Sequence, residues 1–486
     1  MKKTFLLLIA LSLLVIPATA SAVEFTLGGY IKMETIWDST QTQKNLLNPG
    51  GINRNNDPNF QHGRLKMTAE NSRMWFLIKG PTIWGATTTG YIEWDFDEHA
   101  NVNTASGALS YGPQKARIGL RHAFFRLNWP TTELLMGQYW SLLTEEIPET
   151  ANFGAVTTAG QPFERVPQIR LTQKFCDLTA SVAITEPVSG IWGLSLDSSQ
   201  SSGFTGAANN VYGGESSETP KFEGRVKWEA DLWGKAAFWG VPRPFSVRLA
   251  AAWQRTRFRA FSFTNNRTFG QDQWAPGITG VQRDQQYLNN WLVEGSMFIP
   301  VIPTYNKSLA GTASILAQWW VGAGMDIWFE DAPNNASYLK WAGLGDGLAG
   351  NPWQYDRALV KRYGGFIQGQ YYFTNEWYLN AVWGMNKAFG VPQERDLGRV
   401  TGTNPEGYTL ATIGPTSDLL KINQQYNLSL WYRPIQALKF GLEYSYMRSD
   451  FFQKAGPSIA SNPAQNVNVT DRGENHRLMF CGFFFF

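Results

Sequence analysis

Short segments in which hydrophobic and polar residues alternate recur along most of the chain. Residues 91–97 are a clear example, because Ile92, Trp94 and Phe96 alternate with a tyrosine and with acidic residues. Successive side chains of a β-strand point to opposite faces, so a period of two predicts strands with one hydrophobic and one polar face. In residues 221–232 the polar face carries a row of charges that no water-soluble core would tolerate: Lys221, Glu223, Arg225, Lys227, Glu229 and Asp231.

About sixteen such segments follow one another, and the connections between them alternate between short and long. An even-stranded transmembrane barrel has this alternation, with short turns at one end and long extracellular loops at the other. We therefore expect an all-β protein: a transmembrane antiparallel β-barrel of about 16 strands, although the pattern also allows 18. The expected long loops are 39–63, 98–114, 143–165, 188–220, 263–285, 330–357, 389–418 and 451–473.

The N-terminus predicts export. Lys2 and Lys3 precede an apolar run over 5–16, Pro17 and a small-residue ending at Ala22, which is typical of a cleaved secretory signal. We expect residues 1–22 to be a signal peptide and residues 23–486 to form the outer-membrane barrel of a Gram-negative bacterium.

Composition supports a membrane barrel and excludes other classes. The chain contains 21 Trp, 18 Tyr and 31 Phe without any long apolar run, as expected when only alternate residues of each strand meet lipid. The net charge of +3 falls to +1 without Lys2 and Lys3, which argues against a nucleic-acid partner. Cys176 and Cys481 make no disulfide framework, and their redox state stays open.

The third long loop, 143–165, is the candidate for narrowing the channel that a sixteen-stranded tube would otherwise leave open. We expect it to fold into the lumen and to set its acids against arginines of the wall, so that a transverse field filters solutes by charge. The expected constriction arginines are Arg73, Arg117, Arg121, Arg165 and Arg170. The expected acidic wall or loop residues are Glu93, Asp95, Glu145, Glu146 and Glu149.

The inward parity of other strands gives a further set of lumen-facing residues. They are Lys32, Glu34, Glu223, Arg225, Lys227, Glu229, Lys421, Lys439 and Glu443. The chain ends with Phe484 and Phe486 on one face of the last segment, a pattern that outer-membrane insertion machinery reads, and we expect both to serve as the insertion signal.

Several blocks between residues 64 and 175 resemble those of the DcaP-like porins, within the general Gram-negative porin superfamily. They are Ser72-Arg-Met-Trp-Phe76, Gly90-Tyr-Ile-Glu-Trp-Asp-Phe96, Leu120-Arg-His-Ala123, Gly137-Gln-Tyr-Trp-Ser141 and Pro167-Gln-Ile-Arg170. The resemblance implies a homotrimer with an inward third loop and passive uptake of small, often anionic, solutes such as dicarboxylates. It also implies that the five constriction arginines lie near the narrowest point. We expect the N-terminal coiled-coil extension of some members to be absent, because the first expected strand begins almost at the expected cleavage site.

Other interpretations remain open at this level. Arg117 and Arg121 could serve only to hold the loop, and Arg255, Arg257 and Arg259 could face lipopolysaccharide or the lumen. A carbohydrate-specific channel would need aromatic side chains along the lumen, whereas a sheath around a periplasmic partner would need an unobstructed bore. Solute and lipid are the expected partners besides copies of the chain.

Signals for an enzyme are weak, and we expect no catalytic activity, cofactor or metal. The glycine-rich stretch 345–350 has no strand before it and no helix after it, as a dinucleotide site requires. His122 and His476 lie on expected strands, both at outward parity.

Overall fold

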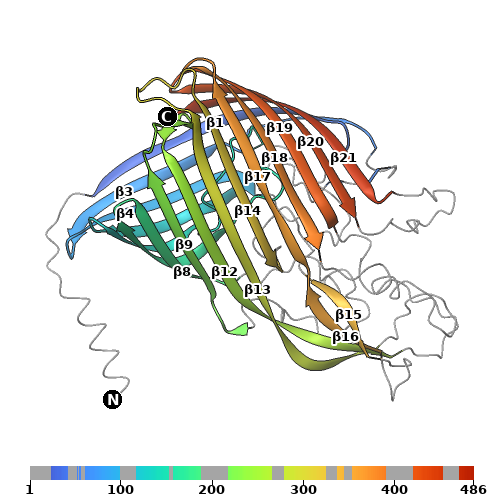
Figure 1. Cartoon of the computed structure of the whole chain (residues 1–486). Helices are drawn as coiled ribbons and strands as arrows, with labels where there is room; N and C mark the ends of the chain where they lie inside the picture. Colours follow the sequence, from blue (N-terminus) through green and yellow to red (C-terminus); the bar gives the residue numbers. More distant parts are fainter. Residues whose placement is uncertain are drawn as a thin grey trace.

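The computed structural model shows a barrel of antiparallel strands that run obliquely around a central lumen (Figure 1). The description covers residues 23–41, 52, 54, 55, 61–98, 117–152, 157–187, 217–264, 279–324, 337–343, 353–389, 420–451 and 470–486. The expected signal peptide, most of the long loops and the glycine-rich stretch 345–350 lie outside these residues. Within them, no helix is long and apolar enough to cross a membrane.

Sixteen strand positions close the barrel, which confirms the expected fold class and the count of 16 rather than 18. Each strand pairs with the next along the chain, and the last pairs with the first. The first half is β1 Glu24–Asp38, β2 Arg64–Thr68 continued by β3 Arg73–Ile83, β4 Ala86–Glu98, β5 Arg117–Asn128, β6 Thr132–Trp140, β7 Arg165–Phe175, β8 Leu178–Thr185 and β9 Lys221–Ala230. The second half is β12 Phe245–Thr264, β13 Thr279–Ile302, β14 Ala313–Ala323, β17 Lys361–Tyr372, β18 Trp377–Phe389, β19 Leu420–Ile435, β20 Leu438–Phe451 and β21 Arg472–Phe485.

The barrel closes between its first and last strands. β1 pairs with β21 from Tyr30 opposite Phe485 to Asp38 opposite Arg477. The amide of Phe486 donates a 3.1 Å hydrogen bond to the carbonyl of Gly29, and the reverse bond measures 3.2 Å. The C-terminal residue is therefore part of the seam, and no strand edge is left open there.

The two faces of the wall differ as the alternation predicts. On β1, Ile31, Met33 and Trp37 are exposed on the outside, whereas Lys32 and Glu34 are completely buried inside. A closed barrel with an apolar outer face and a polar inner face is the arrangement that a bilayer requires, because every backbone group is paired within the wall.

The second strand is interrupted where the sequence shows a slip in parity. β2 and β3 both pair with β1, with Thr68 opposite Glu34 and Arg73 opposite Tyr30. Four residues of this strand thus face three residues of β1, which is a bulge. The bulge restores the inward orientation of Arg73.

One long connection contains an element that the alternation pattern did not show. Residues 330–357 were expected to be irregular, but β15 Ser337–Gly343 and β16 Trp353–Leu359 form a hairpin, and β16 pairs with the far end of β12. β12 and β13 are longer than the other strands and project beyond the barrel together with this hairpin (Figure 1).

One expected short connection, between β9 and β12, also has structure of its own. β10 Ala236–Phe238 and β11 Val241–Arg243 form a small hairpin that packs on the inner face of β13, β14 and β17. Ala236 and Phe238 contact the inward side chains of these strands in an apolar cluster with Phe298, Leu316 and Phe366. Apolar residues at inward positions therefore mark the part of the lumen that the hairpin fills.

Candidate functional site: an off-centre cavity in the lumen

The third long loop lies across the lumen, and its described parts are 141–152 and 157–164. Its backbone is held by inward side chains from widely separated strands. The indole nitrogen of Trp320, on β14, donates a 2.6 Å hydrogen bond to the carbonyl of Gly160, and Gln425, on β19, accepts a 3.1 Å bond from the amide of Ala159. Lys32, on β1, donates a 2.8 Å bond to the carbonyl of Ala151.

Two wall carboxylates hold the loop at opposite ends. Glu223, on β9, accepts bonds of 2.8 Å from the hydroxyl of Ser141 and 2.7 Å from the amide of Leu142. Glu443, on β20, accepts a 2.7 Å bond from the amide of Ala151. Loop amides buried inside the barrel would be costly without partners, and these two carboxylates provide them.

The three loop acids that the sequence analysis named also have cationic partners, but not the expected ones. Glu145 pairs with Arg225 and lies 3.5 Å from the ammonium of Lys227, both on β9. Glu146 accepts two bonds, of 2.7 and 2.8 Å, from the guanidinium of Arg243 in β11.

Glu149 lies on the far side of the lumen. It pairs with Lys439 of β20, and its carboxylate accepts a 2.7 Å bond from the hydroxyl of Tyr378 and a 2.8 Å bond from Gln370. The expectation that these acids face Arg73, Arg121, Arg165 and Arg170 therefore differs from the structure. The loop turns its acids toward β9, β11 and β20 because those segments carry the nearest cations.

Glu145 and Glu146 stay ionised at ordinary pH. Burial by itself would raise the pKa of Glu145, but Arg225 and, more weakly, Arg248 and Lys227 lower the pKa to about 2. Burial opposes ionisation of Glu146 as well, and the guanidinium of Arg243 lowers its pKa below the usual range. Both acids thus act as permanent negative anchors.

Arg73 and Arg121 form a compact cluster with the two acids of β4. The guanidinium of Arg121 lies 2.8 Å from Glu93 and 2.5 Å from Asp95, and the guanidinium of Arg73 lies 3.4 Å from Glu93. Two positive and two negative charges balance here. Glu93 and Asp95 were expected on an acidic wall, and Arg73 and Arg121 on an opposed basic wall. In the structure these four residues form one ion-pair cluster.

A second group of arginines lies further along the same wall, and Arg170 of β7 is its centre. Its guanidinium carbon lies 4.9 Å from the centre of the Tyr139 ring, and that of Arg126, on β5, lies 4.9 Å from the same ring. Arg126 is 3.6 Å from Glu133. Arg170 is buried, and within the described part of the chain no carboxylate lies at ion-pair distance from it.

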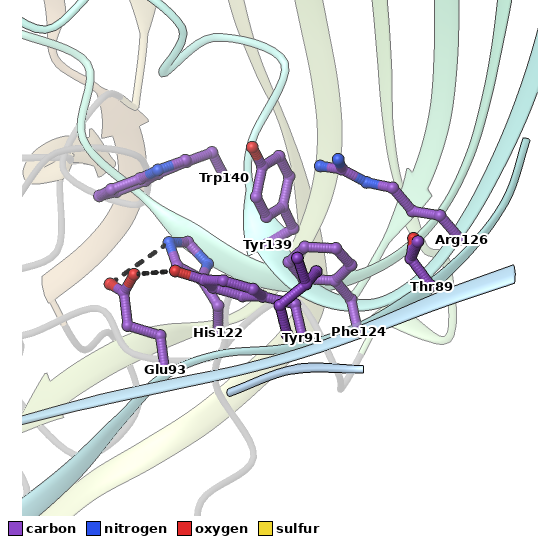
Figure 2. Close-up of a pocket in the computed structure, with 9 residues that line it drawn as sticks. Thr89, Tyr91, Glu93, His122, Phe124, Arg126, Tyr139 and Trp140 are labelled. Atoms are coloured by element: carbon purple, nitrogen blue, oxygen red, sulfur yellow. Dashed lines mark hydrogen bonds and ion pairs between the residues drawn. The ribbon is translucent and has the colours of Figure 1, made fainter. Parts of the chain in front are cut away.

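Aromatic side chains join these two charged groups and line a cavity of about 350 Å³. Figure 2 shows Glu93 at one end and Arg126 at the other, with Tyr91, Phe124 and Tyr139 between them. Tyr91 stacks on Phe124 at 5.4 Å, and Phe124 meets Tyr139 edge-on at 4.7 Å. The remaining lining residues are Leu77, Thr89, His122 and Trp140.

His122 belongs to this cavity, which corrects its expected outward position. A shift in register between β4 and β5 at Glu93 and Trp94 brings Arg121 and His122 to the inner face together. The imidazole Nε2 lies 4.0 Å from Glu93. The sequence carries a signal of this bulge, because the inward residues have odd numbers up to Arg121 and even numbers in His122, Phe124 and Arg126. His476, by contrast, is exposed on the outside, as expected.

The other expected site residues are distributed over the barrel. Lys32 pairs with Glu34 beneath the loop, Glu229 is 2.8 Å from Lys227, and Arg165 lies over Trp140 at 5.2 Å. Lys421 does not join the buried inner row, because a bulge at the start of β19 leaves it exposed and the row begins at Asn423. Arg117 begins β5, but its side chain lies outside the described residues.

Two further expectations concern the outer face. Arg255 is exposed there, 4.5 Å from the Tyr287 ring, and so does not face the lumen; the side chains of Arg257 and Arg259 lie outside the described residues. Phe484 and Phe486 are each 49% exposed, in line with the outward position expected for them.

Cys176 is exposed and Cys481 is buried, and both are free thiols.

Sequence reasoning missed the residues that fill the part of the lumen opposite the cavity. Arg243 and the β10–β11 hairpin, together with the loop, fill the lumen next to β12–β21, so the cavity lies against β3–β6. No alternation pattern shows this, because the hairpin is short and its contacts are distant in sequence.

The fold defines a porin-type outer-membrane barrel with a loop across its lumen. Among solved structures it is similar to the outer membrane channel DcaP of Acinetobacter baumannii, with a TM-score of 0.61 and 13% identity over 96% of this chain and 99% of that chain. It also matches the anion-selective porin from Comamonas acidovorans, with a TM-score of 0.47 and 9% identity over 96% of this chain and 100% of that one. At such identities the likeness shows the fold alone.

No protein-family model matches the sequence, and no curated protein matches it.

Proposed function

We propose that the protein is an outer-membrane channel for passive diffusion of small hydrophilic solutes, with a preference for anions such as dicarboxylates. The closed barrel supports a transmembrane path, and the third loop supports a narrowed one. The resemblance to DcaP-like porins supports the solute class.

Arg170 is the observation that carries the anion preference. A buried guanidinium without a carboxylate partner is costly, and a passing anion would supply the missing charge. Arg126 lies against the same Tyr139 ring, but Glu133 at 3.6 Å balances most of its charge, so the anion preference is assigned to Arg170. The Arg73 and Arg121 cluster contributes less, because Glu93 and Asp95 balance it.

The reversal potential of the purified protein in planar bilayers under a salt gradient tests this function. We expect anion preference, and we expect the permeability ratio of anions to cations to fall severalfold in Arg170→Gln. Arg255→Gln is the matched control, since it removes the same charge from the outer face. Cation preference in the wild type, or an equal effect of the two substitutions, would refute the proposal.

The remaining parts of the proposal concern location and assembly. We propose that residues 1–22 direct export, that Phe484 and Phe486 direct insertion, and that the channel works as a homotrimer. Arg255 on the outer face suits contact with lipopolysaccharide phosphates, as arginine binds phosphate well.

The same geometry bears on the two competing functions, a sheath around a periplasmic partner and a carbohydrate channel. A sheath needs an unobstructed bore, and the loop hydrogen-bonded across the lumen counts against it. A carbohydrate channel needs aromatic side chains along the lumen, and this condition is met locally by Tyr91, Phe124 and Tyr139. We assign no catalytic role to any residue. Within the described residues no group of three or more His, Cys, Asp or Glu could hold a metal ion.

A further inference from the structure

We propose that the aromatic cavity between β3 and β6 is a binding station for a neutral cyclic polyol, such as a monosaccharide or disaccharide. The station concerns a different solute class from the anion preference assigned to Arg170, and binding to it does not depend on that preference.

Aromatic rings line the cavity, and the guanidinium of Arg126 lies 4.6 Å from the centre of the Phe124 ring. Tyr91 and Phe124 are stacked with an interplanar angle of 29°, and Tyr139 closes the row edge-on at 68°. The ring of a sugar or an inositol carries C–H bonds on its faces and hydroxyl groups around its rim. Such a ring can lie against aromatic faces while its rim reaches the polar ends of the cavity.

The polar ends offer hydrogen bonds without demanding charge. Glu93 is already compensated by Arg121 at 2.8 Å and Arg73 at 3.4 Å, and Arg126 has Glu133 at 3.6 Å. An ionised solute would disturb these balanced pairs at either end. Hydroxyl groups, which both donate and accept, suit a carboxylate at one end and a guanidinium at the other.

His122 adds an unsatisfied group to the wall. It is only 3% exposed, and its Nδ1 has no hydrogen-bond partner within the described residues. A buried polar atom without a partner calls for an explanation, and a ligand hydroxyl would reach Nδ1 after a small shift of the lining side chains, because the atom itself is closed to solvent. The cavity volume of about 350 Å³ lies within the range of small-molecule sites.

Isothermal titration calorimetry on purified protein tests the station directly, with glucose, maltose and myo-inositol as ligands. Mannitol is the comparison ligand, because it has the hydroxyl groups but no ring. We expect saturable binding of the cyclic compounds and weaker binding of mannitol. Phe124→Leu keeps an apolar side chain but removes the aromatic face, and it should weaken binding by roughly three- to tenfold.

Phe125→Leu is the matched control, because Phe125 follows on the same strand but is 47% exposed on the outer face. Heat-modifiable migration in gels verifies that each variant is folded. No binding of any cyclic polyol, equal binding of mannitol, or equal effects of the two substitutions would overturn the station. Calorimetry needs no current, so a protein that binds polyols but lacks anion preference would disprove only the proposed selectivity.

Discussion

Arg243 and Glu146 join two segments of chain that the sequence keeps 97 residues apart. The guanidinium donates bonds of 2.8 and 2.7 Å to the two carboxylate oxygens, and both side chains lie inside the barrel. The pair links the β10–β11 hairpin to the third loop, so two inward elements support each other. The lumen is therefore narrowed by a two-part assembly.

Arg243→Met should loosen the loop. It leaves Glu146 buried without its cation, which costs about 3 to 5 kcal/mol for a buried ion pair, and the loop amides nearby lose order. We expect larger and noisier single-channel currents and a lower thermal midpoint. Lys235→Met is the control, since Lys235 belongs to an exposed pair with Asp231. Currents like those of the wild type would show that the loop is held without this pair.

Gly384→Ala should displace the loop from another side. A Cβ at Gly384 would lie 2.1 Å from the carbonyl oxygen of Ala159 and 2.6 Å from the hydroxyl of Thr158, both in the loop. Overpacking of this kind costs about 1 to 3 kcal/mol. We expect altered conductance and lower stability, measured in bilayers and by thermal unfolding.

The control for this change is Gly369→Ala on the neighbouring strand β17, where an added Cβ meets nothing within 4 Å. If both variants behave alike, the contact between β18 and the loop is unimportant for conduction.

Glu93→Gln should increase anion preference. The substitution removes one negative charge from the cluster and leaves the charges of Arg73 and Arg121 less balanced. The reversal potential under a salt gradient should move further toward the equilibrium potential of the anion. A shift toward cations would place the filter elsewhere on the wall.

Loop anchoring should resist acid. The pKa of Glu145 is about 2, below its usual value, so its ion pair contributes stability that is fully present above the usual carboxyl range. That stability is lost only as the pH falls through the folded pKa. We expect the Glu145–Arg225 pair to hold, with unchanged conductance, from neutral pH to about pH 5, and to be lost only near pH 2. Single-channel recording across this pH range tests the expectation. A change in conductance at pH 5 to 6 would contradict the low pKa of Glu145.

The alternation of hydrophobic and polar residues predicted most of the strands of the barrel wall. The bounds of β1 agree with those expected from the sequence, Glu24 to Asp38, and the inward row from Lys221 onward lies on the inner face of β9. Period-two alternation is local, because each residue's face depends only on its position in its own strand. Lys421 and His122 depart from expectation because a bulge adds one residue and reverses the parity beyond it.

Partner choice inside the lumen could not be read from the sequence in the same way. Glu149 and Lys439 are 290 residues apart, and the expected partners of Glu149 lay on a different part of the wall. Which cation a loop acid meets depends on the path of the loop and on what else fills the lumen, and the β10–β11 hairpin supplies the partner of Glu146.

The sequence by itself determined the class of the fold, the polar and apolar faces of the strands and the segment that crosses the lumen. These follow from a short period and from loop length, which are local properties of the chain. The tertiary structure decided that Arg73 and Arg121 are balanced by Glu93 and Asp95, that Arg170 is not balanced, and that aromatic rings line the cavity between them. Charge balance and cavity shape depend on contacts between distant strands, and only the closed barrel brings those strands together.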